Sequence, residues 1–235
     1  MFREDIGDFT YSFEINGKYA CIKKIERKYG ITIEKRSIEK INIPSEVHFN
    51  NYTYIVNSIS GEETTDYTYE AITTDRRRKD YGKSVCTGKY TSINGMLWEL
   101  DHYELMNWGC EIILPKTIRE IELGAFRRSW RGAVNPKVVL NDGIKIIRTG
   151  AFYNCNVNDL IIPSSLKTIE YGAFLDCVER IKLIIDNEPG AVKIHELALC
   201  KPVGIGHREM RKSESEIVYL RPKTSLFAKL IKKLS

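Results

Sequence analysis

The sequence predicts a mainly β repeat solenoid of short parallel strands and short helical turns, with a β-hairpin at its N-terminal end and a helical C-terminal segment. Three observations support this prediction. A motif that ends in Gly-Ala-Phe recurs at intervals of 26 and 22 residues, a period typical of stacked repeats. Alternating apolar residues surround an Asn-Gly pair near the N-terminus. An amphipathic run closes the chain.

Three copies of the motif align without gaps over their central portion. Each copy has two apolar residues, a Pro or Asn that turns the chain, further Ile or Leu positions, and then Gly-Ala-Phe. An insertion around 131–134 accounts for the longer interval, a stretched earlier copy occupies 41–59, and an incomplete later copy begins at Arg180. The aligned copies run from Ile113 to Phe126, from Val139 to Phe152 and from Ile161 to Phe174.

A single coil of this motif cannot fold alone. It buries about five apolar side chains, each worth roughly 1.5–3 kcal/mol. Ordering its ~22 residues costs roughly 1–2 kcal/mol per residue in backbone entropy. We therefore expect the coils to stack, so that their strands form a parallel sheet over one continuous core. In this stack Gly-Ala lets neighbouring coils approach closely, and the phenylalanines form a central spine.

The repeated pattern, I-x-IP-x-S-[VL]-x-x-I-x-x-GAF-x-x-C, is similar to the BspA-type leucine-rich repeats of bacterial surface proteins. The resemblance covers roughly residues 41–60 and 111–186. It implies a leucine-rich-repeat-like fold that binds or adheres to varied partners. Cys155 and Cys177 occupy equivalent places in neighbouring coils, and we expect both to be small apolar fillers. The matching positions are Pro115, Gly124, Ala125 and Phe126 in the first copy, Gly150, Ala151 and Phe152 in the second, where Asn141 replaces the proline, and Pro163, Gly172, Ala173 and Phe174 in the third.

The flanking segments have their own local patterns. The Asn16-Gly17 pair predicts a hairpin turn. Residues 61–92 are polar and lack a clear period, which favours a solvated loop, and a short helix is expected from about 95 to 107. The predicted segments are an N-terminal capping hairpin region (1–40), a first stretched repeat (41–60), a divergent insertion with a short helix (61–110), the leucine-rich repeats (111–186), and a C-terminal cap with a basic tail (187–235).

The end of the chain has two interpretations. In residues 224–234 the apolar positions fall on one helical face and the lysines on the other. Such a helix caps the open end of the last coil. Alternatively, residues 225–234 dock on a membrane surface or on a partner.

Charge and cysteine content narrow the class of protein. Residues 201–235 carry nine Lys/Arg and three Asp/Glu, a charge of +6, whereas the first 200 residues carry 27 and 28, a charge of −1. A neutral body argues against nucleic-acid binding, which needs a basic face. The six cysteines lack C-x-x-C spacing and suggest reduced thiols.

The sequence also bears on location. Its longest apolar runs are too short to span a membrane, and its N-terminus lacks the layout of a signal peptide. We therefore expect a cytoplasmic protein or, where a leader has been removed, a cell-surface or secreted one.

No catalytic constellation is visible in the sequence. His195, Cys200 and His207 form the only loose metal-like group, and their spacing fits no standard zinc arrangement. The run 204–206 lacks both the lysine of a phosphate loop and the third glycine of a dinucleotide site. We therefore predict that the chain is not an enzyme and uses no cofactor and no metal.

Strand alternation identifies a candidate partner-binding face. If Leu114, Leu140, Ile162 and Leu183 point inward, their neighbours form an outward apolar row beside a row of alternating charge. An exposed apolar row with a polar rim is typical of interfaces. Two other interpretations are that exposed Ile and Val are ordinary strand formers, and that the 61–110 insertion covers them. The outward positions are Ile113, Val139, Ile161 and Lys182 in the first row and Glu111, Lys137, Asp159 and Arg180 in the second.

The leading functional prediction is a non-enzymatic module that binds a protein partner through this face. The alternative is a structural or adhesive protein that attaches to a surface through its basic C-terminal tail. The two differ in salt response, because attachment by exposed charges weakens steeply with ionic strength and an apolar contact does not.

Overall fold

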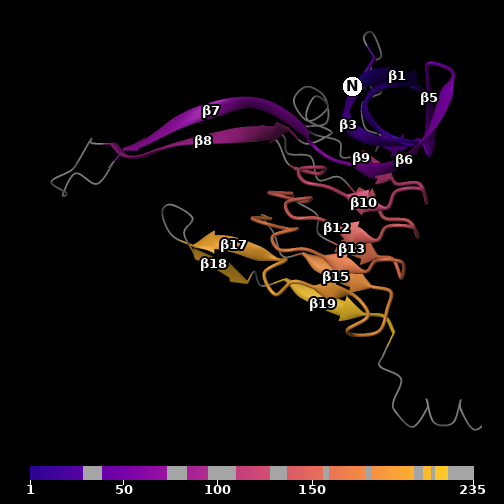
Figure 1. The fold of residues 1–235 in the computed structure, drawn as a ribbon. Coiled ribbons are helices and arrows are strands. Elements are labelled where there is room, and N and C mark those ends of the chain that lie inside the picture. The colour runs from indigo at the N-terminus through magenta and orange to yellow at the C-terminus, as the bar shows by residue number, and fades with distance from the viewer. Residues whose placement is uncertain are drawn as a thin grey trace, which may run out of the picture.

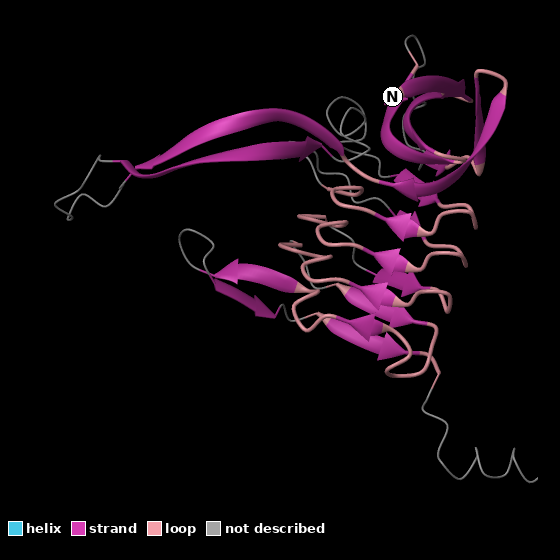
Figure 2. Cartoon of the chain, viewed as in Figure 1, coloured by secondary structure: helices cyan, strands magenta, loops and turns pink. Residues whose placement is uncertain are grey.

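The computed structural model shows strand-rich coils stacked one on another, with a sheet at the N-terminal end of the stack (Figure 1). Within the described residues no helix is present, and the corners of the coils are turns (Figure 2). The expected short helical turns are therefore wrong for these coils. The expected helices at 95–107 and 224–234 lie outside the described part. The structure describes residues 1–28, 39–72, 84–94, 110–127, 137–155, 159–177, 181–203, 209–212 and 215–221.

The N-terminal sheet joins the stack through a parallel strand pair. The predicted hairpin is confirmed, because β2 pairs antiparallel with β3 around Gly17, whose φ is 61°. A second hairpin turns at Asn50 and Asn51, both with positive φ, which suits a tight two-residue turn. β3 then runs parallel to β6. The strands are β1 (Phe2–Ile6), β2 (Phe9–Asn16), β3 (Tyr19–Arg27), β5 (Glu46–Phe49) and β6 (Tyr52–Ile59).

The coils contribute strands to two parallel ladders. The first, called the strand face below, comprises β4 (Glu39–Asn42), β9 (Cys110–Ile113), β11 (Lys137–Val139), β13 (Asp159–Ile162), β15 (Lys182–Ile185) and β19 (Glu216–Tyr219). It consists of two three-stranded sheets that meet where β11 contacts β13. The second ladder continues from β6 through β10 (Glu120–Ile121), β12 (Ile146–Ile147), β14 (Thr168–Ile169) and β16 (Lys193–Ile194).

In the three coils that contain Gly-Ala-Phe, this motif forms the turn on the third side. The amide of Gly124 donates to the carbonyl of Gly150 at 3.1 Å, and the amide of Gly150 donates to the carbonyl of Gly172 at 3.1 Å. Gly150 has a φ of +67°, a conformation that residues with a Cβ rarely adopt. The ring of Phe152 stacks between those of Phe126 and Phe174, with centroid separations of 4.8 and 4.9 Å. The expected phenylalanine spine is therefore present.

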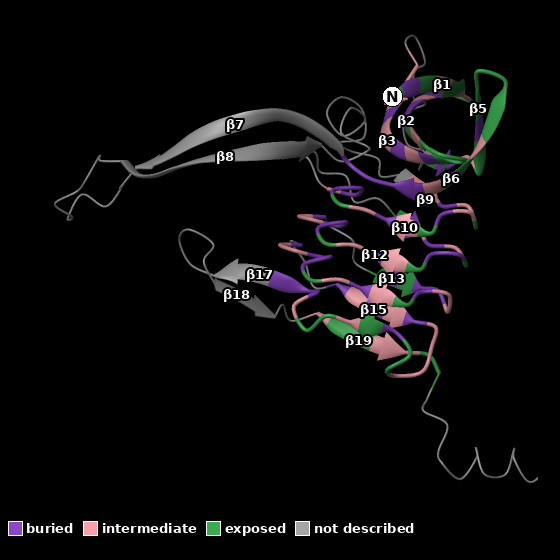
Figure 3. Cartoon of the chain, viewed as in Figure 1, coloured by how far each residue is buried: buried purple, intermediate pink, exposed green. Residues whose placement is uncertain are grey.

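One hydrophobic core runs from the N-terminal sheet through the coils. Buried and more exposed residues alternate along the strands of the coils (Figure 3), and the buried apolar ones belong to this core. Cys155 and Cys177 are buried free thiols, and the Cys177 thiol donates to the carbonyl of Phe152 at 3.1 Å. Both are small members of the hydrophobic core, as the repeat pattern predicts.

The segment 61–92 differs from the expected solvated loop. β7 (Glu62–Ile72) and β8 (Ser84–Asn94) form a long antiparallel hairpin that projects from the stack (Figure 1). These stretches are rich in Thr and Tyr, which favour strands. The expectation of a solvated loop was based on the polar composition of the segment, and it is wrong for both strands.

Both ladders continue beyond residue 186. β16 pairs with β14, and β19 pairs with β15 after the antiparallel pair β17 (Cys200–Val203) and β18 (Glu209–Lys212). The register also corrects the alignment of the fourth copy. Lys182 pairs with Asp159, and Ile184 pairs with Ile161. The sequence alignment was wrong by two residues because Gly-Ala-Phe does not recur in this coil.

The stacked rings give a first test of the coil packing. Phe152 is fully buried between two rings, so Phe152→Ala should lower the free energy of unfolding by about 3–5 kcal/mol. Chemical denaturation of the full chain measures this loss. Tyr52→Ala is the matched control, because Tyr52 is 68% exposed. A loss below about 1 kcal/mol for Phe152→Ala would contradict the stacking.

Candidate functional site

Six side chains of alternating sign follow one another along the strand face. Strand pairing places Lys40, Glu111 and Lys137 on successive rungs, and likewise Asp159, Lys182 and Glu216. The offset of 22 residues that pairs Ile146 with Thr168 also aligns Lys137 with Asp159. This charge row therefore comprises Lys40, Glu111, Lys137, Asp159, Lys182 and Glu216.

At three places, neighbouring members of the charge row form ion pairs. Glu111 lies between two ammonium groups, at 2.7 Å from Lys137 Nζ and 3.6 Å from Lys40 Nζ. The hydrogen bond from Lys137 holds the pKa of the Glu111 carboxyl below its ordinary value. Lys182 Nζ lies 3.7 Å from a carboxylate oxygen of Glu216. Each exposed pair contributes only about 0–1 kcal/mol to the free energy of folding. The stability of the fold therefore does not explain why the charges alternate so regularly.

An apolar row runs beside the charge row, two residues further along each strand. Its members are outward-facing and partly exposed, and Ile161 is the most exposed of them at 61%. On the rung of β4 the equivalent residue is the exposed Asn42. The apolar row comprises Ile113, Val139, Ile161, Ile184 and Val218.

From β4 to β15 the residues between the two rows, and the residues after them, are buried, whereas Ile217 on β19 is 36% exposed. Ile112 and Leu114 flank Ile113 and are fully buried, as are Leu160 and Ile162 on either side of Ile161. This alternation follows from the pleat of a β-strand, in which successive side chains point to opposite faces. The same short strand therefore supplies both core and surface.

The structure places seven of the eight sequence-predicted face residues on the two rows. Glu111, Lys137 and Asp159 lie in the charge row, with Lys182 beside them instead of in the apolar row. Ile113, Val139 and Ile161 lie in the apolar row. Arg180 lies outside the described residues.

Sequence reasoning missed four members of the rows. Lys40 was within reach, because Lys40-Ile41-Asn42 has the same alternation as Glu111-Ile112-Ile113. Ile184 was lost through the two-residue error in the fourth copy. Glu216 and Val218 follow a hairpin that interrupts the repeat, and no local pattern shows that the chain returns to the ladder.

The second ladder, formed by β6, β10, β12, β14 and β16 and called the short-strand side below, has an ion-pair network of its own. Arg148 donates to Glu120 at 2.8 Å through Nε and to Glu170 at 3.1 Å through Nη1. The hydrogen bond to Glu120 raises the pKa of Arg148. Glu120, Arg148 and Glu170 belong to three successive coils, so this network ties coils together.

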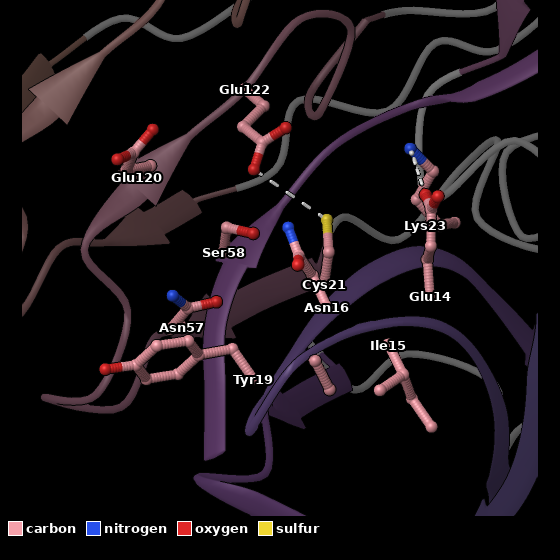
Figure 4. A pocket seen from close by; sticks show the side chains of 11 residues that line it. Glu14, Ile15, Asn16, Tyr19, Cys21, Lys23, Asn57, Ser58, Glu120 and Glu122 are labelled. Carbon is pink, nitrogen blue, oxygen red and sulfur yellow. Dashed lines mark hydrogen bonds and ion pairs between the residues drawn. The ribbon is translucent and has the colours of Figure 1, made fainter. Parts of the chain in front are cut away.

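A pocket of about 450 Å³ lies where the N-terminal sheet meets the first coils (Figure 4). β2 and β3 supply one wall, and β6 with β10 and the residue after it supplies the other. The Cys21 thiol points toward the Glu122 carboxylate, at 4.0 Å. Burial raises the pKa of this thiol. The thiol is therefore protonated at neutral pH, which makes it a poor nucleophile.

Two further features concern the described residues alone. There, no three His, Cys, Asp or Glu side chains come close enough to hold a metal ion. No helix in that part of the chain has the length and apolar character needed to cross a membrane.

Comparison with protein families identifies the repeats. Residues 110–201 match six copies of the BspA type leucine rich repeat region. This stretch is a BspA-type leucine-rich-repeat region. The resemblance predicted from Gly-Ala-Phe and its neighbours is confirmed there, and the repeat region extends past residue 186 in agreement with the strand ladders. A comparison with curated proteins finds no match.

Three solved structures resemble the chain. A leucine-rich repeat protein from Bacteroides ovatus is 18% identical with a TM-score of 0.42, and 81% of this chain covers 40% of that one. The pneumococcal vaccine antigen PcpA is 12% identical with a TM-score of 0.41, and the shares are 94% and 49%. A leucine-rich cell surface protein from Faecalibacterium prausnitzii is 16% identical with a TM-score of 0.35, and the shares are 82% and 46%. The chain thus spans less than half the length of each.

Two adjacent isoleucines test the orientation of the strand face. Ile161 is 61% exposed and Ile162 is fully buried. Ile161→Ser should therefore change the free energy of unfolding by no more than about 0.5 kcal/mol, whereas Ile162→Ser should lower it by about 3–5 kcal/mol through lost packing and a buried hydroxyl. Denaturant titration of both variants measures the difference. Equal losses would show that the face is assigned to the wrong side.

Proposed function

We propose that the chain is a non-enzymatic recognition module, built on a leucine-rich-repeat solenoid, that binds a protein partner through its strand face. The observation that supports the proposal best is the apolar row with its charged border. Ile161 is 61% exposed at the middle of the row, whereas its neighbours Leu160 and Ile162 are fully buried in the core beneath it. Exposed apolar surface with a polar rim marks interaction sites.

The two rows suit different parts of recognition. Burial of the apolar row supplies binding free energy, because it removes apolar surface from water. The charge row supplies specificity and orientation, since a partner must present the complementary order of charges. Both rows lie on strands held in register by neighbouring coils, so little conformational entropy is lost when they bind.

A second candidate function is attachment to a surface through the basic end of the chain. The observation that favours it is the charge of +6 over residues 201–235. Binding of this kind should weaken steeply as salt is raised. The recognition proposal does not depend on whether the chain works in the cytoplasm or at the cell surface.

Affinity capture with two lysine variants tests the recognition proposal. Ile161→Lys places a charge in the middle of the apolar row and should weaken retention of a partner from a cell extract by about tenfold or more. Leu123→Lys is the matched control, because Leu123 is 48% exposed but follows β10 on the short-strand side.

The comparison uses variants whose circular dichroism equals that of the parent chain. Loss of the same protein by Ile161→Lys, with retention by Leu123→Lys, is the expected result. Equal retention by all three chains would remove the strand face as the binding site. If retention instead declines steeply with salt in every chain, the basic end is the attachment site.

A further inference from the structure

The order of charges in the charge row is complementary to its own reverse. Read along the stack, the signs are positive at Lys40, negative at Glu111, positive at Lys137, and then negative, positive and negative at Asp159, Lys182 and Glu216. Turning the row end for end therefore puts a residue of opposite sign at every rung.

A two-fold rotation about an axis parallel to the strands reverses the order of the rungs in this way. Such an axis, lying between β11 and β13, places a second strand face against the first with the two stacks antiparallel. It brings Lys137 opposite Asp159 of the second copy, Glu111 opposite Lys182, and Lys40 opposite Glu216. All six inter-chain pairs are attractive, and the symmetry makes the interface isologous.

The same operation brings the apolar rows together. Because a rotation about the strand direction leaves each position along the strand unchanged, the apolar row faces the apolar row. Val139 meets Ile161 next to the axis, and Ile113 meets Ile184 one rung further out. The residue that the single chain leaves most exposed in this row, Ile161, is thereby buried at the centre. A parallel arrangement with rung facing the same rung would instead oppose like charges wherever the charge rows meet.

The lysines of the charge row are accessible to a second chain. In the part of the chain that the structure describes, the side chains of the charge row remain open to solvent at several rungs, with Lys137 at 74% and Lys40 at 66% exposed. An ammonium group has three donors, so a lysine that pairs within its chain can also pair across the interface.

We propose that the partner of the strand face is a second copy of this chain, docked antiparallel through the charge row and the apolar row. This inference rests on the proposed function, since it names the occupant of the proposed binding face. In this dimer the two copies recognise each other by the order of charges along the charge row. The short-strand side and the pocket beside Cys21 remain free.

Sedimentation velocity of the full chain over a concentration series provides the first measurement. The parent chain should sediment as a dimer of the 27.1 kDa chain and dissociate on dilution. Lys137→Glu places a carboxylate opposite Asp159 at two symmetric places, and Asp159→Lys opposes two lysines there. Each variant should raise the dimer dissociation constant by about tenfold or more. Lys193→Glu, an exposed change on the short-strand side, should leave the constant unchanged.

Mixing the two variants isolates the contact between chains. In an equimolar mixture of Lys137→Glu and Asp159→Lys, each chain keeps its own altered row, but the residues that face each other across the axis again have opposite charge. The mixture should therefore form a heterodimer with an affinity close to that of the parent chain. Circular dichroism of the separate variants confirms that both remain folded.

Three results would overturn the inference. One is a parent chain that stays monomeric at every concentration. The second is a dimer that neither variant weakens, because that dimer uses another surface. The third is a mixture that does not associate. A monomeric parent chain would contradict the dimer but not the proposed function. The proposed function fails by a different result, in which Ile161→Lys retains every protein that the parent chain captures from an extract.

Discussion

The hydrogen bonds between neighbouring coils are the constraint on which the rest of this structure depends. Arg148 N donates to Ile121 O at 2.9 Å, and one coil later Glu170 N donates to Ile147 O at 3.0 Å. Such bonds recur on all three sides of the coil, so equivalent residues lie directly above one another. The phenylalanine spine, the buried isoleucines and the surface rows are all consequences of this register.

Because successive side chains of a strand point to opposite faces, one set of residues stabilises the core and the other is available for recognition. Ile162 completes the core, while its neighbour Ile161 projects from the surface. The coil-to-coil register repeats that division, and short strands thereby produce two continuous rows. A long, regular row with an exposed apolar side chain at its centre contributes little to folding and risks unspecific association. An antiparallel second copy removes the exposed surface and makes the alternating charges serve as the recognition code.

The sequence predicted what is periodic or local and missed what depends on distant pairing. The Gly-Ala-Phe motif of Gly150 and Phe152 recurs in three coils, and Asn16-Gly17 is a local turn signal. The repeats and the first hairpin could therefore be predicted. The return of Glu216 to the ladder could not be predicted, because a hairpin separates it from the preceding coil. The pocket was also out of reach, since Cys21 and Glu122 are brought together only by the order β3-β6-β10.

Zero-length crosslinking tests the register of the strand face most directly. A carbodiimide joins a lysine to a carboxylate only where the two are in contact, and peptide mass spectrometry then identifies the linked residues. We predict links from Glu111 to Lys137 and from Lys182 to Glu216, whose charged atoms lie 2.7 and 3.7 Å apart. Links from Lys137 to carboxylates outside the charge row, with none to Glu111, would contradict the stacked register and the binding face derived from it.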